Sequence, residues 1–177
     1  MAIPVSLDDA KIQLRVELDD AERDDEIRGF IDDAAAWIEE WTGHILEARD
    51  VTAEFSALDR MTFREYPIAS DAVPTVTYEG ADGQAWPVTT VRMNVSARPA
   101  RVVSWVGYRF PAIPVGAPIT VTVRAGYEDA DTVPGVFRRV MLMLIGAYDD
   151  DREGGATLEK AEKTARRLCN GLRIRRL

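Results

Sequence analysis

The only histidine, His44, and the only cysteine, Cys169, are the side chains of this sequence best suited to proton transfer or nucleophilic attack. His44 follows Gly43 at the end of a predicted helix, and no nucleophile or further metal ligand is suggested near it, so we expect a structural role. Cys169 lies beside an apolar helical seam without a base partner, which favours a buried small residue. The sequence contains no phosphate-binding loop, dinucleotide fingerprint, HExxH or GxSxG motif. We therefore predict no catalytic residue, no metal site, no cofactor and a non-enzymatic function.

A cluster of acidic residues suggests calcium binding at first sight. Its members are Asp19, Asp20, Glu22, Asp24, Asp25 and Glu26. An EF-hand loop requires glycine at its sixth position and glutamate at its twelfth, but a loop starting at Asp20 has Asp25 and Ile31 there. Acids near the start of a helix are instead stabilised by its dipole. We interpret the cluster as solvated acids that precede a helix.

Charge is distributed unevenly along the chain. Residues 1–50 contain fifteen acidic and five basic residues, whereas the last twelve residues contain five arginines and no acid. A basic terminus on an acidic body is typical of an arm that docks on nucleic acid, on a membrane, or on an acidic or grooved protein. Leu172, Ile174 and Leu177 alternate with the arginines, which a purely solubilising tail would not need. The net charge of −8 disfavours wrapping of DNA, because most of the surface would repel its phosphates.

Helical patterns occupy both ends of the sequence. Ser6 has the character of an N-cap, and Leu7, Ala10, Leu14 and Leu18 follow at helical spacing. A second apolar stripe runs from Ile27 to Trp41 and ends before Gly43, a typical helix-stopping glycine. A third helix begins near Pro134 and is apolar around most of its circumference, which predicts a core helix or one shared with another chain. The last helix has a seam at Leu158, Ala161, Ala165, Leu168 and Leu172.

The middle of the sequence changes to strand patterns. Short segments rich in β-branched and aromatic residues are separated by Pro and Gly, and Asp82-Gly83 is a hairpin signal. The predicted strands are 51–55, 75–78, 86–91, 102–106 and 119–123. The order predicts an α+β fold: about four helices, two at each end, with a small, mostly antiparallel β domain inserted. We expect residues 1–48 and 132–177 to form the helical core with its basic arm, and residues 49–131 the insertion.

Three stretches of the sequence resemble the head–tail connector family, also called adaptor or head-completion proteins, of long-tailed phages and gene transfer agents. The first is Ser6 to Val16, which is similar to the family's opening helix. The second runs from Ile27 to Leu46, with Trp41-Thr42-Gly43 near its end. The third begins with Val123-Arg124-Ala125-Gly126-Tyr127 and continues through Val133-Pro134 and the apolar helix to Tyr148 and Arg152-Glu153. The order and spacing of these stretches match the long form of the family, which carries a β insertion.

The resemblance implies a structural virion protein. Its members form a ring, twelvefold like the portal, that extends the DNA channel and presents a platform for the stopper or tail. It implies a location at the virion neck, partners that include portal and stopper or tail proteins, and passing DNA that is not bound sequence-specifically. It also implies that the C-terminal segment reaches into the portal. The expected portal-binding residues are Arg166, Arg167, Leu172, Arg173, Ile174, Arg175, Arg176 and Leu177.

Two further surfaces follow from the ring hypothesis. A closed ring needs a heterologous contact between neighbours, and the apolar third helix suggests Phe137, Met141, Leu144 and Tyr148 for it. A negatively charged channel wall would let DNA slide, and the acids between Asp19 and Glu26 are candidates for that wall.

An alternative function is a small DNA-binding regulator that uses the basic tail. It would need a basic recognition helix, whereas the first two predicted helices are acidic. The start of the sequence has no signal-peptide pattern, and the longest uncharged helical run, Val140 to Tyr148, is far short of the about 20 residues that span a bilayer. We therefore expect synthesis in the cytoplasm of a bacterial host and no membrane partner.

Overall fold

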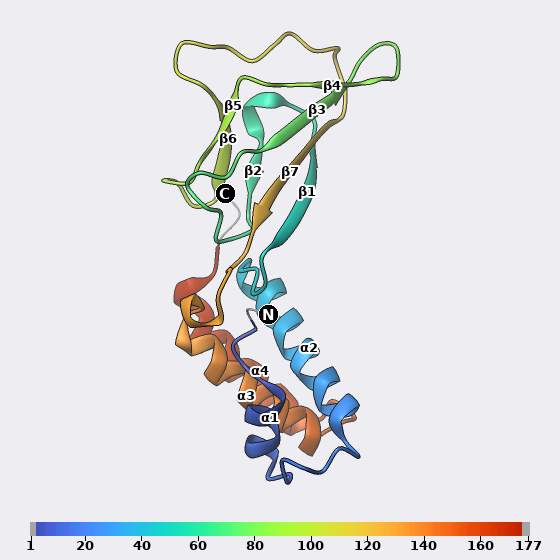
Figure 1. The fold of residues 1–177 in the computed structure, drawn as a ribbon, viewed down its shortest axis with the longest axis vertical. Helices are drawn as coiled ribbons and strands as arrows, with labels where there is room; N and C mark the ends of the chain where they lie inside the picture. Colours follow the sequence, from blue (N-terminus) through green and yellow to red (C-terminus); the bar gives the residue numbers. More distant parts are fainter. Residues whose placement is uncertain (1–2, 175–177) are drawn as a thin grey trace. The chain divides into compact units, whose positions relative to one another are not determined.

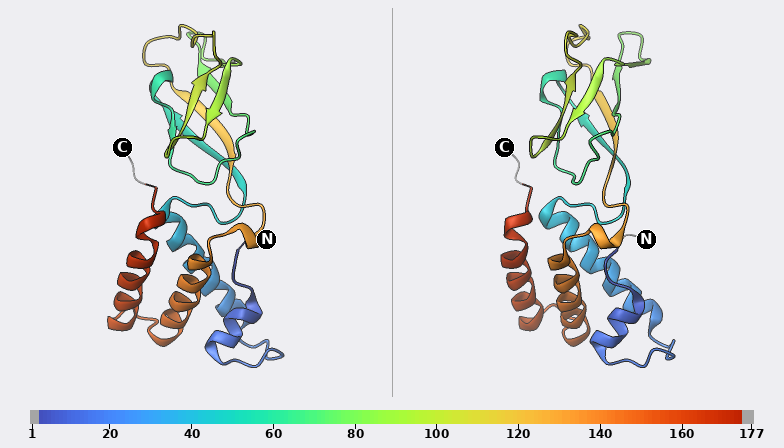
Figure 2. Two further views of the ribbon diagram at one scale, coloured as in Figure 1. Left: turned by 90° about the vertical axis from the view of Figure 1, so that its left-hand side faces the viewer. Right: turned by 60° about the vertical axis from the view of Figure 1, so that its left-hand side comes forward.

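The structure, a computed structural model, describes residues 3–174 and has a mixed α+β fold (Figures 1 and 2). It divides into two compact units. The helical unit contains residues 3–47 and Tyr127–Arg173, and the β unit contains Ala48–Gly126 together with Ile174. The short segment 127–131, which the sequence analysis placed in the insertion, belongs to the helical unit.

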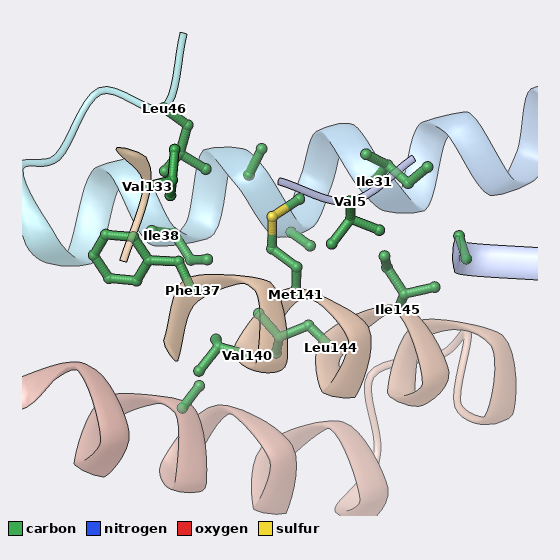
Figure 3. Packing of buried hydrophobic residues seen from close by; sticks show 14 of the residues in the cluster. Val5, Ile31, Ile38, Leu46, Val133, Phe137, Val140, Met141, Leu144 and Ile145 are labelled. Atoms are coloured by element: carbon green, nitrogen blue, oxygen red, sulfur yellow. The ribbon is translucent and has the colours of Figure 1, made fainter. Parts of the chain in front are cut away.

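The helical unit contains four α-helices. They are α1 (Leu7–Leu14), α2 (Asp24–Thr42), α3 (Gly135–Asp150) and α4 (Ala156–Cys169), with short 3₁₀ turns at Ala130–Thr132 and Asn170–Leu172. Helix α3 packs against each of the other three. Its residues Phe137, Val140, Met141, Leu144 and Ile145 are fully buried among Ile27, Ala34 and Ile38 of α2 and Ala165 of α4 (Figure 3). Helix α3 is therefore the central helix of this unit, which explains why it is apolar around most of its circumference.

The helix ends follow the predicted capping chemistry. The Ser6 hydroxyl accepts a hydrogen bond from the Asp9 N–H at 3.1 Å, and the Asp9 carboxylate accepts one from the Ser6 N–H at 3.1 Å. These bonds lower the pKa of Asp9 below its usual value, with the Ser6 backbone bond as the largest cause. At the C-terminal end of α2, Gly43 has φ of 80°, the left-handed conformation that ends many helices.

Two details of the helices differ from the sequence predictions. Helix α1 ends at Leu14 because Arg15 takes a left-handed conformation with φ of 58°, so Leu18 lies outside the helix and is exposed. On α4 the buried stripe passes through Ala161, Ala165 and Cys169, and Leu168 points to solvent. The position four residues after Ala165 returns to the buried face, because a helix turns once in 3.6 residues.

The β unit contains two antiparallel sheets. The four-stranded sheet has the order β1 (Arg49–Phe55), β7 (Ile119–Ala125), β3 (Thr75–Glu79) and β4 (Ala85–Pro87). The three-stranded sheet has the order β2 (Thr62–Phe63), β6 (Ala100–Ser104) and β5 (Val91–Asn94), and a 3₁₀ turn covers Leu58–Arg60. The rings of Phe55 and Phe63 lie 5.6 Å apart and join the two sheets.

Register and burial in the β unit follow strand alternation. In the central strand β7, Ile119, Val121, Val123 and Ala125 are buried, and Val123 lies opposite Val51 of β1. The Asp82-Gly83 turn joins β3 to β4 as predicted, with Gly83 at φ of 72°. The predicted strand 86–91 is wrong: its ends belong to β4 and β5, which lie in different sheets. Pro87, which has no N–H to donate, ends β4 at the edge of its sheet.

Candidate functional site

The C-terminal end of the helical unit gathers the residues that the sequence analysis assigned to docking. Arg166 and Arg167 lie on the last turns of α4, so they belong to a regular helix and not to a free arm. Arg166 forms an ion pair with Glu162 at 3.0 Å, whereas Arg167 is exposed. Arg175, Arg176 and Leu177 lie outside the described residues.

Trp41 organises the arginines of this region. Its ring stacks on that of Trp37, with centroids 6.2 Å apart, and both side chains are half-buried on α2. The guanidinium carbon of Arg173 lies 4.1 Å from the Trp41 ring centroid, and that of Arg166 lies 5.2 Å from it. Such cation–π contacts hold the cations close to the ring. We call Trp37, Trp41, Arg166 and Arg173 the tryptophan–arginine surface.

His44 holds the 3₁₀ turn after α4 in place. The imidazole is buried, its Nδ1 lies 2.8 Å from the Tyr127 hydroxyl and its Nε2 lies 2.9 Å from the Leu172 carbonyl oxygen. Because a carbonyl oxygen can only accept a hydrogen bond, Nε2 is protonated and its N–H donates a hydrogen bond to the Leu172 carbonyl oxygen. His44 therefore joins Tyr127 to the 3₁₀ turn that follows α4.

Two residues of the expected arm have structural contacts that the sequence did not suggest. Leu172 is half-buried against the helical core, and its carbonyl is bound by His44. The Ile174 side chain is buried in the β unit, where it lines a pocket with Phe63, Tyr66 and Pro99. Portal binding through the side chain of Ile174 does not fit this structure, because that side chain is already covered.

The acidic cluster is partly neutralised by the chain itself. Lys11, only 2% exposed, places its Nζ 2.5 Å from Asp24 Oδ1, 2.7 Å from the Asp20 carbonyl oxygen and 3.1 Å from that of Leu18. The Asp24 contact is an ion pair, and no hydrogen bond to Asp24 Oδ1 is formed within residues 3–174. Lys11 thus fastens the segment between α1 and α2, and sequence reasoning gave it no role.

A second group of charges joins the start of α2 to the end of α3. Arg23 pairs with Glu26 at 2.8 Å and with Asp149, and Arg152 pairs with Glu26 at 2.6 Å. Hydrogen bonds to Glu26 and then Asp149 raise the pKa of Arg23 above its usual value. Two cations thus balance two acids. Asp25 pairs with Arg28 at 2.9 Å but is fully exposed, and Asp19 and Glu22 are exposed as well.

The apolar residues assigned to a subunit interface lie mostly inside the chain. Phe137, Met141 and Leu144 are fully buried in the helical core, so they cannot contact a neighbouring subunit in this structure, and that assignment is wrong for these three. Tyr148 alone is half-exposed, and its ring lies 6.1 Å from that of Phe30. Burial, followed by Asp33 and Glu162, raises the pKa of Tyr148 to about 12, so the phenol stays protonated.

The β unit exposes apolar side chains that its sheets do not cover. Trp86 lies on the edge strand β4, and Trp105, Val106, Tyr108 and Val115 lie in the loop between β6 and β7. Exposed apolar groups concentrated in one loop are typical of a protein-binding surface.

The start of α4, the helix that presents Arg166 and Arg167, depends on Asp151. Its carboxylate accepts hydrogen bonds from the N–H groups of Gly155 at 2.9 Å, Thr157 at 3.0 Å and Leu158 at 3.3 Å. These donors, Gly155 first, lower the pKa of Asp151 below its usual value of 3.8. The carboxylate therefore acts as the N-terminal cap of α4, whose own N-cap residue is Gly155.

We expect Asp151→Ala to lower the melting temperature at pH 7, because the first N–H groups of α4 lose their acceptor. A carboxylate whose pKa is depressed by folding stabilises the protein above its ordinary pKa, and this stabilisation is lost as the pH falls through the folded pKa. The difference in melting temperature between the wild type and the variant should therefore narrow below about pH 3.8. Circular dichroism melts at several pH values measure it, with Asp150→Ala as the control. A pH-independent difference would contradict the cap.

Within residues 3–174, no helix has the length and apolarity of a bilayer-spanning segment. No three His, Cys, Asp or Glu side chains of that part of the chain are grouped so that they could hold a metal ion.

Comparison with known proteins identifies the fold. No family model and no curated protein matches the sequence. Solved structures do match it. A chain from the neck of an empty GTA particle, computed with C6 symmetry, has a TM-score of 0.78 and 20% identity, and the match covers 100% of this chain and 94% of that one.

Two further solved structures are similar to this chain over almost its whole length. A chain from the virion of a native gene transfer agent (GTA) particle has a TM-score of 0.75 and 21% identity over 98% of this chain and 91% of that one. A chain from the neck of a native GTA particle, computed with C12 symmetry, has a TM-score of 0.68 and 21% identity over 99% and 91%. The chain therefore shares its fold, helical unit and β unit together, with chains of these particles.

Proposed function

We propose that this protein is a structural component of a virion neck, an adaptor that forms a ring between the portal and the stopper or tail and extends the DNA channel. The observation that carries the proposal is the likeness over the whole chain, with a TM-score of 0.78, to a chain of a GTA particle neck. The order of the sequence stretches at both ends, from Ser6 to Arg152-Glu153, supports the same family.

The proposed ring has twelve copies. Neck structures with the same fold were computed with C6 and C12 symmetry, and twelve copies satisfy both. A ring requires each copy to present two different surfaces that complement each other.

The proposed channel wall includes the exposed acids that precede α2. Carboxylates that face the passing genome repel its phosphates and prevent tight binding. Asp19 and Glu22 are exposed and are the main candidates for this wall, whereas Asp24 and Glu26 are engaged by Lys11, Arg23 and Arg152, and Asp25 pairs with Arg28. An assembled ring with Asp19 to Glu26 on its outer surface would overturn this part of the proposal.

The proposed portal contact involves Arg167 and the last three residues. Deletion of Arg175–Leu177 leaves every described contact in place, including the Leu172 carbonyl bond and the buried Ile174. We expect the shortened protein to melt as the wild type does but to lose capture by immobilised portal in a pull-down. A longer deletion from Gly171 is less useful, because it also removes these structural contacts.

The outcomes of this experiment are distinct. Full capture of the shortened protein would show that the last three residues do not bind portal. If the full-length protein also fails to bind portal, and electron microscopy of the mixture shows no ring, the adaptor function itself is wrong.

A further inference from the structure

An open groove runs along the outer side of α3 in the helical unit. Its volume is about 670 Å³, and α3 forms its floor between Gln13 of α1 and the face of α4 that carries Thr157, Lys160 and Thr164. The floor is apolar and includes Leu142, Met143, Gly146 and Ala147. The left view of Figure 2 shows α3 between α4 and α1, with α2 behind them. The groove therefore follows α3 from Gly135 to Asp150 and is a candidate site for a further helix.

The rim of the groove is basic. Arg138, Arg139 and Lys160 line it, together with one carboxylate, Asp150. Arg138 pairs with Asp9 of α1 at 2.8 Å. Arg139 and Lys160 are exposed and have no ion-pair partner within residues 3–174. Two cations at the groove are thus available to an acidic partner.

The outer face of α2 has the complementary character. Its exposed residues Asp25, Gly29, Asp32, Ala36 and Glu40 are spaced by four, three, four and four positions, so they form one stripe. Asp33 is exposed beside this stripe, and neither it nor Asp32 has an ion-pair partner within residues 3–174. The stripe combines acids with small residues, which permit another helix to approach closely. We call these five residues and Asp33 the acidic stripe.

We infer that the acidic stripe of one copy occupies the groove of the next copy in the proposed ring. The inference rests on the proposed function for the ring, and on charge complementarity for the choice of surfaces. A second copy supplies a complete helix with the required charge.

The positions of the two surfaces suit a large ring. The acidic stripe lies opposite the buried face of α2, the groove lies opposite the buried face of α3, and these two buried faces pack against each other. Stripe and groove are therefore on opposite sides of the helical unit. With twelve copies, successive copies turn by 30°, since 360° divided by 12 is 30°. Nearly opposite surfaces are what so small a turn requires.

Disulfide trapping tests the contact directly. We would mix Ala36→Cys protein with Gly146→Cys protein under mild oxidation and look for a dimer that contains one copy of each. A side chain at Gly146 has space, because its Cβ would lie 3.7 Å from the nearest atom, the Gln13 Nε2. The native Cys169 is buried, which raises its pKa to about 11, so it does not compete at neutral pH. Lys163→Cys, which is exposed on α4 outside the groove, replaces Gly146→Cys in the control.

Charge reversal provides an independent test. The groove variant Arg139→Glu/Lys160→Glu and the stripe variant Asp32→Arg/Asp33→Arg should each self-associate at least about tenfold more weakly than the wild type, because like charges then face each other. An equal mixture should recover association, since each variant offers a surface that complements the other. Sedimentation velocity measures all three samples.

The results separate this inference from the proposed function. A mixed dimer through Ala36 and Gly146, absent from the control, together with recovery in the mixture, supports the inference. Suppose that electron micrographs show rings on portal but the mixed dimer does not form, or that neither charge reversal affects the rings. Either result would overturn the inference and leave the adaptor function standing. The selective dimer without any ring on portal would support the contact between copies and contradict the adaptor function.

Discussion

Lys11→Met is expected to reduce the free energy of unfolding by about 3 kcal/mol, because it leaves a largely buried carboxylate and two carbonyl oxygens without their cation. The Lys11 ammonium contacts the carbonyl oxygens of Leu18 and Asp20 and the carboxylate of Asp24, which is 19% exposed. Methionine preserves the aliphatic part of the side chain, so the loss reports on the charge and its contacts. The figure is at the lower end of the range for broken buried pairs, because Asp24 retains some access to water.

Urea denaturation followed by the helical circular dichroism signal measures the effect. Lys163→Met on the exposed face of α4 is the matched control and should change the free energy of unfolding by less than about 0.5 kcal/mol. A loss below about 1 kcal/mol for Lys11→Met would show that water replaces the ammonium at these oxygens. The connection between α1 and α2 would then not depend on Lys11.

The role of Lys11 illustrates what the sequence could not predict. Two of its three partners are backbone carbonyl oxygens, which leave no trace in a pattern of side chains. A lysine that closely follows Asp8 and Asp9 in a charged stretch also has the appearance of a solvent-exposed residue. Its burial depends on the path of residues 15–23, which turn back over α1 after Arg15 adopts its left-handed conformation.

The periodic elements were predictable for a physical reason. The apolar stripe from Ile27 to Trp41 and the stop at Gly43 predicted α2 well, because burial on one face imposes helical spacing. The alternation of residues 119–123 predicted β7 in the same way. Residues 86–91 lack such a signal: the irregular residues 88–90 divide them between two sheets, and only pairing with distant strands determines where each part belongs.

The contacts of the candidate docking segment could not be predicted from the sequence either. In sequence, Arg166 to Leu177 reads as one basic, partly apolar arm. In the structure, Arg166 and Arg173 lie against Trp41, His44 binds the Leu172 carbonyl, and Ile174 is buried in the β unit. Trp41 and His44 precede this segment by more than a hundred residues, so no local pattern could reveal the contacts. Ile174 is the one described residue of the segment whose burial argues against portal contact through its side chain.

The apolar surface of α3 presented two alternatives at the sequence level, a core helix or a helix shared between chains. Its buried residues form one face of the helix, and the basic groove that we infer to be an interface lies on the opposite face. The inner face, with Phe137, Met141 and Leu144, packs within the chain, whereas Leu142, Met143 and Gly146 form the groove floor. A substitution on the inner face should therefore affect folding, and one at the groove should affect association.

Phe137→Ala is expected to reduce the free energy of unfolding by about 3–5 kcal/mol, the usual cost of removing a fully buried aromatic ring. The Phe137 ring is fully buried, and its centroid lies 4.9 Å from that of His44 at an interplanar angle of 80°. The cavity would open beside the His44 imidazole, which holds Leu172. The variant should therefore also loosen the 3₁₀ turn that leads to Arg173.

Trp37→Ala is the informative comparison, because Trp37 belongs to the predicted apolar stripe of α2 but is only half-buried at the edge of the core, where it stacks on Trp41. We expect a loss well below that of Phe137→Ala in the same urea titration, since less apolar surface leaves water at this position. If Phe137→Ala instead left the free energy of unfolding unchanged and abolished self-association, α3 would be an inter-subunit helix after all. Equal losses for the two variants would show that Trp37 is covered as fully as Phe137, which would require a partner on the tryptophan–arginine surface.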